Sequence, residues 1–178
     1  MDDVRLSKFL SLVLRHKPQK IGLTLDAEGW VDVEALLAAM AREGKAINRA
    51  RLERVVANND KQRYGFDETG TRIRARQGHS LKVEMNFAAV APPPRLWHGT
   101  VERFIRPIFV EGLKPGRRQH VHLSADIDTA RAVGARRGRP VVLTVDAAAM
   151  QAAGHEFYLS DNGVWLTAAV PPGFLSQA

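Results

Sequence analysis

The sequence has no cysteine among its 178 residues, which excludes several kinds of chemistry at once. No disulfide, thiolate nucleophile or cysteine-ligated zinc site can form. An uninterrupted apolar run of about 18 or more residues is also missing, so we expect no transmembrane helix and no membrane partner. The opening segment MDDVRLSKFL begins with acidic residues and lacks a signal-peptide pattern. Together these features predict a folded protein of the cytoplasm.

Several familiar catalytic motifs are lacking as well. The chain has no GxxxxGK[ST] phosphate loop, no GxGxxG turn and no GxSxG elbow. The segment HEFYL at 155–159 fails the HExxH zinc pattern because Leu159 stands where a second histidine is required. These absences exclude the common classes of kinase, dinucleotide-fold oxidoreductase, serine hydrolase and zinc protease.

What the sequence does have is a surplus of positive charge. Lysine and arginine number 26 against 19 acidic residues, which gives a net charge of +7. Such a surplus favours anionic partners, although it also describes a mildly basic, solvated surface.

The chain divides at MNFAAVAPPPRL, residues 85–96, because three consecutive prolines are incompatible with a helix or a central strand. We therefore predict two lobes, residues 1–88 and 89–178. In the first lobe, apolar residues recur at helical spacing up to Leu14, and Asp32 and Asn48 are typical caps of two further helices. A hairpin with its turn at Thr69-Gly70 follows. Three helices followed by a hairpin indicate a winged-helix module.

The second lobe has a different pattern, in which short strands alternate with helices and end in a hairpin. The expected strands are 96–100, 121–124 and 140–145, the expected helices are 101–113 and 126–138, and the hairpin spans 157–168. No glycine-rich strand-to-helix turn is present, so a doubly wound sheet is not expected. The whole chain is predicted to be α+β with small, split β-sheets.

Arginine and histidine are frequent at the boundaries of these elements, and both are typical of phosphate-handling sites. An arginine offers a planar fork of donors that matches phosphate oxygens. A histidine, with a pKa near ~6.5, transfers protons at neutral pH. The residues in question are Arg15, His16, Arg74, His79, His98, His122, Arg136 and Arg137. Spacing alone leaves open whether they are instead helix caps, hydrogen-bonded core histidines, or parts of a solvated strand face or helix end.

Six segments, in order along almost the whole chain, resemble the RNA 2′-phosphotransferase family, also called tRNA 2′-phosphotransferase. They are LSKFLSLVLRHKP (6–18), GWVDVEALL (29–37), IRARQGHS (73–80), LWHGT (96–100), HVHLS (120–124) and VGARRGRPVVL (133–143). The resemblance implies an amino-terminal winged-helix lobe and a carboxyl-terminal ADP-ribosyltransferase-like lobe that binds NAD.

The resemblance also implies a two-step reaction without metal. An internal 2′-phosphate of RNA, as at a tRNA splice junction, attacks the nicotinamide-bearing carbon of NAD and forms a 2′-phospho-ADP-ribosyl RNA. The adjacent ribose hydroxyl then attacks the phosphorus, which releases RNA with a free 2′-hydroxyl and ADP-ribose 1″,2″-cyclic phosphate. NAD is thus consumed as a co-substrate. We expect a monomer, because no apolar stripe is left over for a partner.

The same resemblance assigns roles to individual residues. The expected catalytic set is Arg15, His16, Arg74 and Arg136. The expected NAD-binding set is His98, Gly99, Thr100, His122, Leu123 and Ser124. Secondary contacts with the RNA phosphate are expected from Gln77, His79, Ser80 and Arg137. One departure affects this last group, because many relatives have Arg-His-Gly where this chain has Arg136-Arg137-Gly138.

Two other functions remain open. One is an ADP-ribosyltransferase that caps a terminal phosphate of RNA or DNA and stops there. The other is a non-catalytic protein whose winged helix binds duplex DNA.

Overall fold

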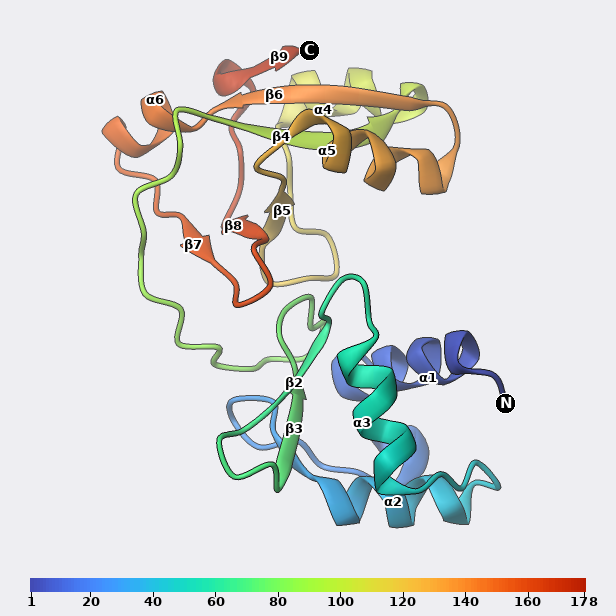
Figure 1. The fold of residues 1–178 in the computed structure, drawn as a ribbon. Helices are drawn as coiled ribbons and strands as arrows, with labels where there is room; N and C mark the ends of the chain where they lie inside the picture. Colours follow the sequence, from blue (N-terminus) through green and yellow to red (C-terminus); the bar gives the residue numbers. More distant parts are fainter. The chain divides into compact units, whose positions relative to one another are not determined.

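The computed structural model describes residues 1–178 and has two compact units, Met1–Asn86 and Phe87–Ala178 (Figure 1). Both units combine helices with small antiparallel sheets, so the predicted α+β class is confirmed. The division lies ahead of the three prolines at 92–94. None of the helices combines the length and apolar character needed to cross a membrane.

The first unit contains the three helices predicted from the sequence. They are α1 (Asp3–Arg15), α2 (Val33–Arg42) and α3 (Arg49–Ala57). Each begins after a side chain that accepts a hydrogen bond from a backbone amide of the first turn, as N-cap residues do. These caps are Asp2, Asp32 and Asn48. A short 3₁₀ turn, η1 (Pro18–Ile21), follows α1. The α-helix cannot continue through Pro18, because proline lacks the backbone N–H that the helix requires.

The predicted hairpin forms from β2 (Tyr64–Phe66) and β3 (Arg72–Ala75), which pair antiparallel. A two-residue strand that the sequence did not reveal, β1 (Val31–Asp32), pairs with the other edge of β3. Side chains alternate along β3, so Ile73 is buried in the core whereas Arg74 lies on the opposite face.

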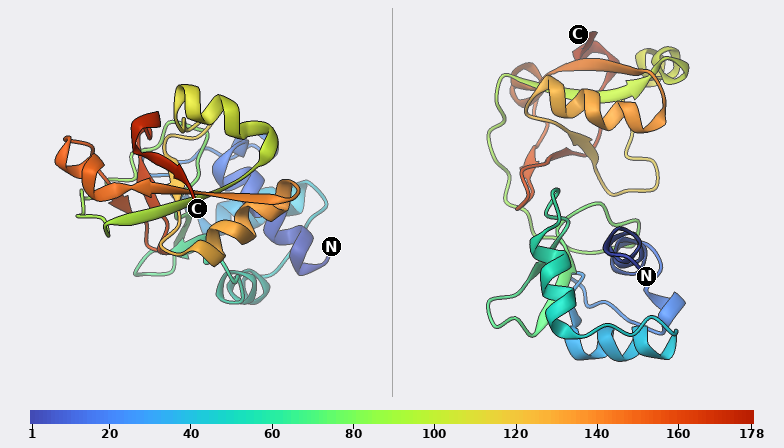
Figure 2. Two further views of the ribbon diagram at one scale, coloured as in Figure 1. Left: turned by 90° about the horizontal axis from the view of Figure 1, so that it is seen from above. Right: turned by 45° about the vertical axis from the view of Figure 1, so that its right-hand side comes forward.

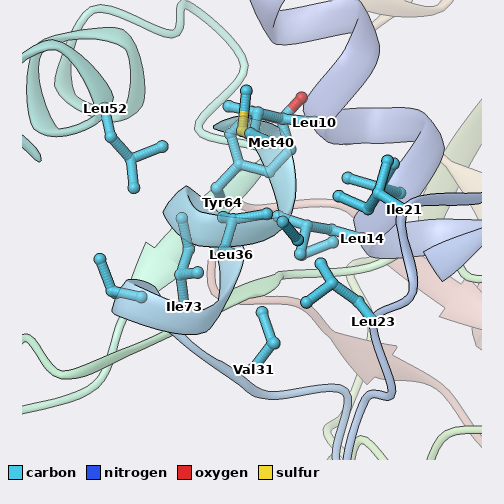
Figure 3. Packing of buried hydrophobic residues seen from close by; sticks show 14 of the residues in the cluster. Leu10, Leu14, Ile21, Leu23, Val31, Leu36, Met40, Leu52, Tyr64 and Ile73 are labelled. Atoms are coloured by element: carbon cyan, nitrogen blue, oxygen red, sulfur yellow. The ribbon is translucent and has the colours of Figure 1, made fainter. Parts of the chain in front are cut away.

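The core of the first unit packs the apolar faces of the helices against the sheet. Leu10 and Leu14 of α1 meet Leu36 of α2, Tyr64 of β2 and Ile73 of β3, and all five are at most 1% exposed (Figure 3). This packing fixes the carboxyl end of α1 relative to β3, which matters below because both carry candidate residues.

The second unit contains two three-stranded antiparallel sheets. The first has the order β4 (Arg95–Val101), β6 (Pro140–Asp146), β9 (Leu175–Gln177), and the second the order β5 (Val121–Leu123), β8 (Trp165–Thr167), β7 (Tyr158–Leu159). Trp97 of β4 and Ser124, just after β5, exchange backbone hydrogen bonds of 3.0 and 2.8 Å that join the two sheets. The predicted strands and the hairpin are confirmed, whereas β9 was not predicted.

The helices of this unit are shorter than predicted. The expected helix at 101–113 is divided into a 3₁₀ turn, η2 (Glu102–Phe104), and α4 (Ile105–Glu111), in which Pro107 lies in the first turn, where its missing N–H is tolerated. The expected helix at 126–138 consists of α5 (Ile127–Gly134) followed by the 3₁₀ turn η3 (Ala135–Arg137). Helix α6 (Ala147–Ala152) and the 3₁₀ turn η4 (Pro172–Phe174) were not predicted.

Helix α5 lies along the β4–β6 pair (Figure 2), and two glycines allow a very close approach between helix and strand. A Cβ atom built on Gly99 would lie 1.7 Å from the carbonyl oxygen of Ala130 in α5. A Cβ atom on Gly134 would lie 2.7 Å from the carbonyl oxygen of Thr100. The distance between α5 and β4 is therefore short because neither position carries a side chain. The 3₁₀ turn η3, with Arg136 and Arg137, follows α5 directly and is kept close to β4 in the same way.

Candidate active-site residues of the two units

In the first unit, the segment 77–80 packs against the carboxyl end of α1. The backbone N–H of Ser80 donates a hydrogen bond of 3.0 Å to the carbonyl oxygen of Arg15. The Ser80 hydroxyl and Nδ1 of His16 lie 2.9 Å apart and share a hydrogen bond, across 64 residues of sequence. This bond fixes the orientation of the imidazole ring. Ser80 thus acts through His16.

Arg74 is held without a carboxylate. Its guanidinium carbon lies 4.4 Å from the centre of the Trp30 ring, and Nη1 donates a long hydrogen bond of 3.4 Å to the carbonyl oxygen of Glu28. Neighbouring Arg72 instead forms ion pairs with Asp67 and Asp26, at 3.2 and 3.6 Å. The charge of Arg74 is therefore oriented but not neutralised, as a site for an anion requires.

His79 lies at the base of this cluster and is 2% exposed. Burial, followed by the positive charges of Arg15, His16 and Arg74, lowers the pKa of His79 to about 4, so its ring is neutral at pH 7. Arg15, His16 and Arg74 therefore all lie near His79. Nε2 of His79 makes no hydrogen bond and lies over Gly29. This burial favours a packing role for His79 over direct contact with a substrate.

Gln77, the remaining candidate of this segment, is half-buried, and its Oε1 is buried without a hydrogen-bond partner. A buried acceptor of this kind is costly unless a ligand satisfies it. Because Oε1 is buried, a ligand would reach it only after the Gln77 side chain turns outward.

In the second unit, His98 of β4 has a defined tautomer. Its Nδ1 lies 3.1 Å from the backbone carbonyl oxygen of His122. Because a carbonyl oxygen only accepts, Nδ1 carries the proton, and Nε2 presents a lone pair. Burial lowers the pKa of His98, the bond to His122 partly opposes this, and Arg137 lowers the pKa further. A neutral imidazole with an acceptor nitrogen is suited to bind a ribose hydroxyl.

A pocket of about 220 Å³ adjoins His98. Polar walls are provided by His98, Thr100 and Arg137, and apolar walls by Phe104 and Ile108. Its volume is below the roughly 300–1,000 Å³ of sites for drug-sized ligands. The pocket therefore fits one ring system with its ribose, and the rest of a dinucleotide would extend outside it.

Positive charge gathers beside this pocket. Arg118, which the sequence analysis missed, donates a hydrogen bond of 3.0 Å from Nη1 to Nδ1 of His122. Burial and the nearby charge of Arg137 lower the pKa of Arg118, so the two guanidinium groups repel each other. Arg136 is exposed and, like Arg137, has no carboxylate within ion-pair distance. An anion bound between these cations would relieve the repulsion.

Three of the expected NAD-binding residues contribute to the framework of the site. Leu123 is 2% exposed and belongs to the apolar core of the second unit. Ser124 pairs through its backbone with Trp97, and Gly99 faces α5. Of the expected set, His98 and Thr100 line the pocket directly, and His122 contributes through its contacts with His98 and Arg118. No group of three or more His, Asp and Glu side chains in the chain has an arrangement that would hold a metal ion.

Comparison with known proteins gives a consistent result. A family model described as “RNA 2'-phosphotransferase, Tpt1 / KptA family” matches residues 1–169. A protein of Agrobacterium fabrum named “Probable RNA 2'-phosphotransferase” is 58% identical over 170 residues, which cover 96% of this chain and 91% of that protein. Proteins of the same name from Streptomyces griseus and Hahella chejuensis are 56% identical over 179 residues and 55% identical over 170 residues. These two matches cover 97% and 96% of this chain and 95% and 91% of the relatives. The matched region contains all the candidate residues described above.

Proposed function

Because the chain belongs to the RNA 2′-phosphotransferase family, we propose that it removes an internal 2′-phosphate from RNA in a reaction that consumes NAD. The proposal assigns the RNA phosphate to the first unit and NAD to the second. The observation that carries it is the meeting of α1 with the segment 77–80, where a hydrogen bond orients His16 beside Arg15 and an arginine without a carboxylate, Arg74.

The folds of the two units support this division of roles. Three helices and a three-stranded antiparallel sheet in the first unit are the elements of a winged helix, and we assign it to that class. Two small split sheets and a pocket at β4 that fits one ring system with its ribose, both in the second unit, are compatible with an ADP-ribosyltransferase-like lobe. In that lobe the Nε2 lone pair of His98 accepts a hydrogen bond from a ribose hydroxyl of NAD, and Arg118 and Arg137 attract its pyrophosphate.

In the first step the 2′-phosphate attacks the ribose carbon that carries nicotinamide, and the C–N bond breaks to release nicotinamide. The phosphate is already anionic at neutral pH, so the protein needs to align it and needs no strong base. Arg74 is suited to this task because the Trp30 ring and the Glu28 carbonyl fix the direction of its guanidinium. Arg15 is the other cation of the first unit that the proposal assigns to the transferred phosphate. Arg136, for which the family resemblance implies a catalytic role, belongs to η3 of the second unit.

In the second step the 2″-hydroxyl of the ADP-ribose attacks the phosphorus, and the bond between phosphorus and the RNA 2′-oxygen breaks. The departing oxygen requires a proton, and the attacking hydroxyl loses one. We assign the proton donor to Nε2 of His16, whose other nitrogen is held by Ser80. The arginines stabilise the negative charge that develops on the phosphodiester. The products are RNA with a 2′-hydroxyl and ADP-ribose 1″,2″-cyclic phosphate.

The test is to incubate the purified protein with a short RNA that bears one internal 2′-phosphate, with and without NAD, and to weigh the products by mass spectrometry. We expect loss of phosphate only with NAD, together with nicotinamide and the cyclic phosphate. A stable ADP-ribosylated RNA without cyclic phosphate would refute the second step and indicate a capping activity. No change in either tube would refute the enzymatic proposal.

A further inference from the structure

A second depression in the first unit lies outside the cluster of His16 and Arg74. It is a groove of about 450 Å³ between the amino-terminal two-thirds of α1 and the turn that links α3 to β2. Its polar lining includes Ser7, Lys8, Ser11, Asn58, Lys61 and Arg63. None of these residues has a role in the reaction described above.

The shape of the groove is fixed by hydrogen bonds beneath it. Asn59, which is 8% exposed, donates from Nδ2 to the Ser7 hydroxyl at 2.9 Å and accepts from the backbone N–H of Arg63 at 3.2 Å. The buried Tyr64 hydroxyl lies 2.6 Å from the Ser11 hydroxyl. The two walls are thus tied together before any ligand binds, which reduces the entropy lost on binding.

The charge of the groove favours an anion. Lys8 and Arg63 have no carboxylate within ion-pair distance, whereas the carboxylate of Asp3, at one end, is held by Arg51 at 3.0 Å and Arg54 at 3.5 Å. These arginines also lower the pKa of Asp3. Asp60 is the only other acidic residue in the lining. Serine hydroxyls and an asparagine amide complete a surface that suits a sugar–phosphate chain.

Two structural elements lead from the groove to the candidate phosphate site. Ser11 and Arg15 are one turn apart on α1, a rise of about 6 Å. Beside the sheet, the backbone N–H of Arg76, the residue that follows β3, bonds to the carbonyl oxygen of Arg63, and Arg76 is two residues from Arg74 along the chain. Phosphates next to one held by Arg15 and Arg74 would therefore reach the groove along either element.

We propose that this groove binds the RNA strand flanking the 2′-phosphorylated nucleotide, an inference that rests on the proposed function. The groove contacts the backbone of neighbouring nucleotides and raises affinity for longer RNA, whereas the reacting phosphate is held by the cluster around His16. Groove residues thus act on substrate length and not on the chemical steps.

The test compares two substrates with two variants at saturating NAD. The substrates are a trinucleotide with a central 2′-phosphate and an RNA of about twelve nucleotides with the same centre. The variant Lys8→Gln/Arg63→Gln removes two charges from the groove. Its control, Arg42→Gln/Lys45→Gln, removes the same two charge types from the end of α2 and the loop after it.

We expect the groove variant to raise KM for the longer RNA roughly tenfold and to leave kcat and the trinucleotide parameters unchanged. The slope of log KM against log salt for the longer RNA should fall by about 1.4, because each lost phosphate contact contributes about 0.7. Equal losses on both substrates, or an equal loss in the control variant, would overturn the inference.

Equilibrium binding separates this inference from the proposed function. A labelled RNA of the longer length, without a 2′-phosphate, should bind the groove variant roughly tenfold more weakly than the unmodified protein, whether or not turnover occurs. Weaker binding without any NAD-dependent turnover would support the groove and refute the reaction. Unchanged binding together with normal turnover would support the reaction and refute the groove.

Discussion

A methyl group at Gly99 is the smallest change that should displace a whole element of the second unit. A Cβ atom there would lie 1.7 Å from the Ala130 carbonyl oxygen, whereas an ordinary contact is 3.4 Å or more. The atoms within reach belong to the backbone of α5, so no side-chain rotation relieves the overlap. The strand and the helix must therefore separate by about 1.7 Å, and η3 with Arg136 moves away from His98.

The expected magnitude follows from this displacement. A misplacement of about 1 Å in a reacting complex lowers the rate roughly a hundredfold, so Gly99→Ala should lower kcat/KM for NAD by about that factor or more. Overpacking should lower the free energy of unfolding by about 1–3 kcal/mol. The assay is NAD-dependent release of nicotinamide in the presence of 2′-phosphorylated RNA, with the folded fraction measured by circular dichroism at the same temperature.

Two further glycines provide a graded series in the same unit. A Cβ atom on Gly134 would lie 2.7 Å from the Thr100 carbonyl oxygen, a smaller overlap, so Gly134→Ala should have an intermediate effect. A Cβ atom on Gly173 would meet no atom within 4 Å, so Gly173→Ala should behave as the unmodified protein. The reasoning would be refuted if Gly99→Ala kept its melting temperature and its kcat/KM for NAD, or if the order of the three variants were reversed.

Three further outcomes can be checked with single substitutions. Trp30→Leu should lower kcat/KM for RNA about five- to thirtyfold, because a cation–π contact of about 1–2 kcal/mol no longer holds Arg74. Trp30→Phe should restore most of the loss, because phenylalanine keeps an aromatic ring at this position. Equal effects of the two substitutions would contradict this role of Trp30. The pKa of His79 is lowered to about 4 in the folded state. Between pH 6.5 and 4 the unfolded chain therefore binds more protons than the folded protein does. The free energy of unfolding should fall by up to about 3 kcal/mol as the pH falls through this range. Urea titrations of His79→Phe should lack this dependence, and a variant that kept it would place its origin elsewhere. Arg118→Ala should raise KM for NAD about tenfold and leave binding of RNA unchanged, since it removes a charged donor from His122; an effect on RNA alone would refute the assignment.

The parts of the fold that the sequence predicted are those determined locally. Helix α2 depends on the Asp32 cap and on apolar spacing within ten residues, so its bounds could be inferred before the structure was known. Strand β1 has only two residues and exists because Val31 pairs with Ile73, far along the chain. Strand β9 similarly requires pairing with β6. Helix α6 did have a local signal, because the Asp146 side chain caps it, but the pattern was not recognised.

The candidate site shows the same division. Arginine and histidine at element boundaries marked Arg15, His16 and Arg74, but only the folded chain shows that Ser80 orients His16. Trp30 lies within the segment 29–37 that resembles the family, yet its contact with Arg74 depends on the packing of the turn at 26–30 against β3. Arg118 was missed because it lies in a loop without periodicity, and its partner His122 is defined by β5.

Net charge by itself did not locate a site, but the pattern of ion pairing in the first unit does. Most arginines outside the cluster are paired with carboxylates, namely Arg5, Arg49, Arg51, Arg54 and Arg72. Arg74 is oriented by an aromatic ring and a carbonyl oxygen, which fix its direction without cancelling its charge. His79 nearby is neutral at pH 7, so it does not compensate the charge of Arg74. Since an uncompensated, preorganised cation gains most from binding an anion, this difference between neighbours on one strand supports the proposal that Arg74, and not Arg72, binds the phosphate.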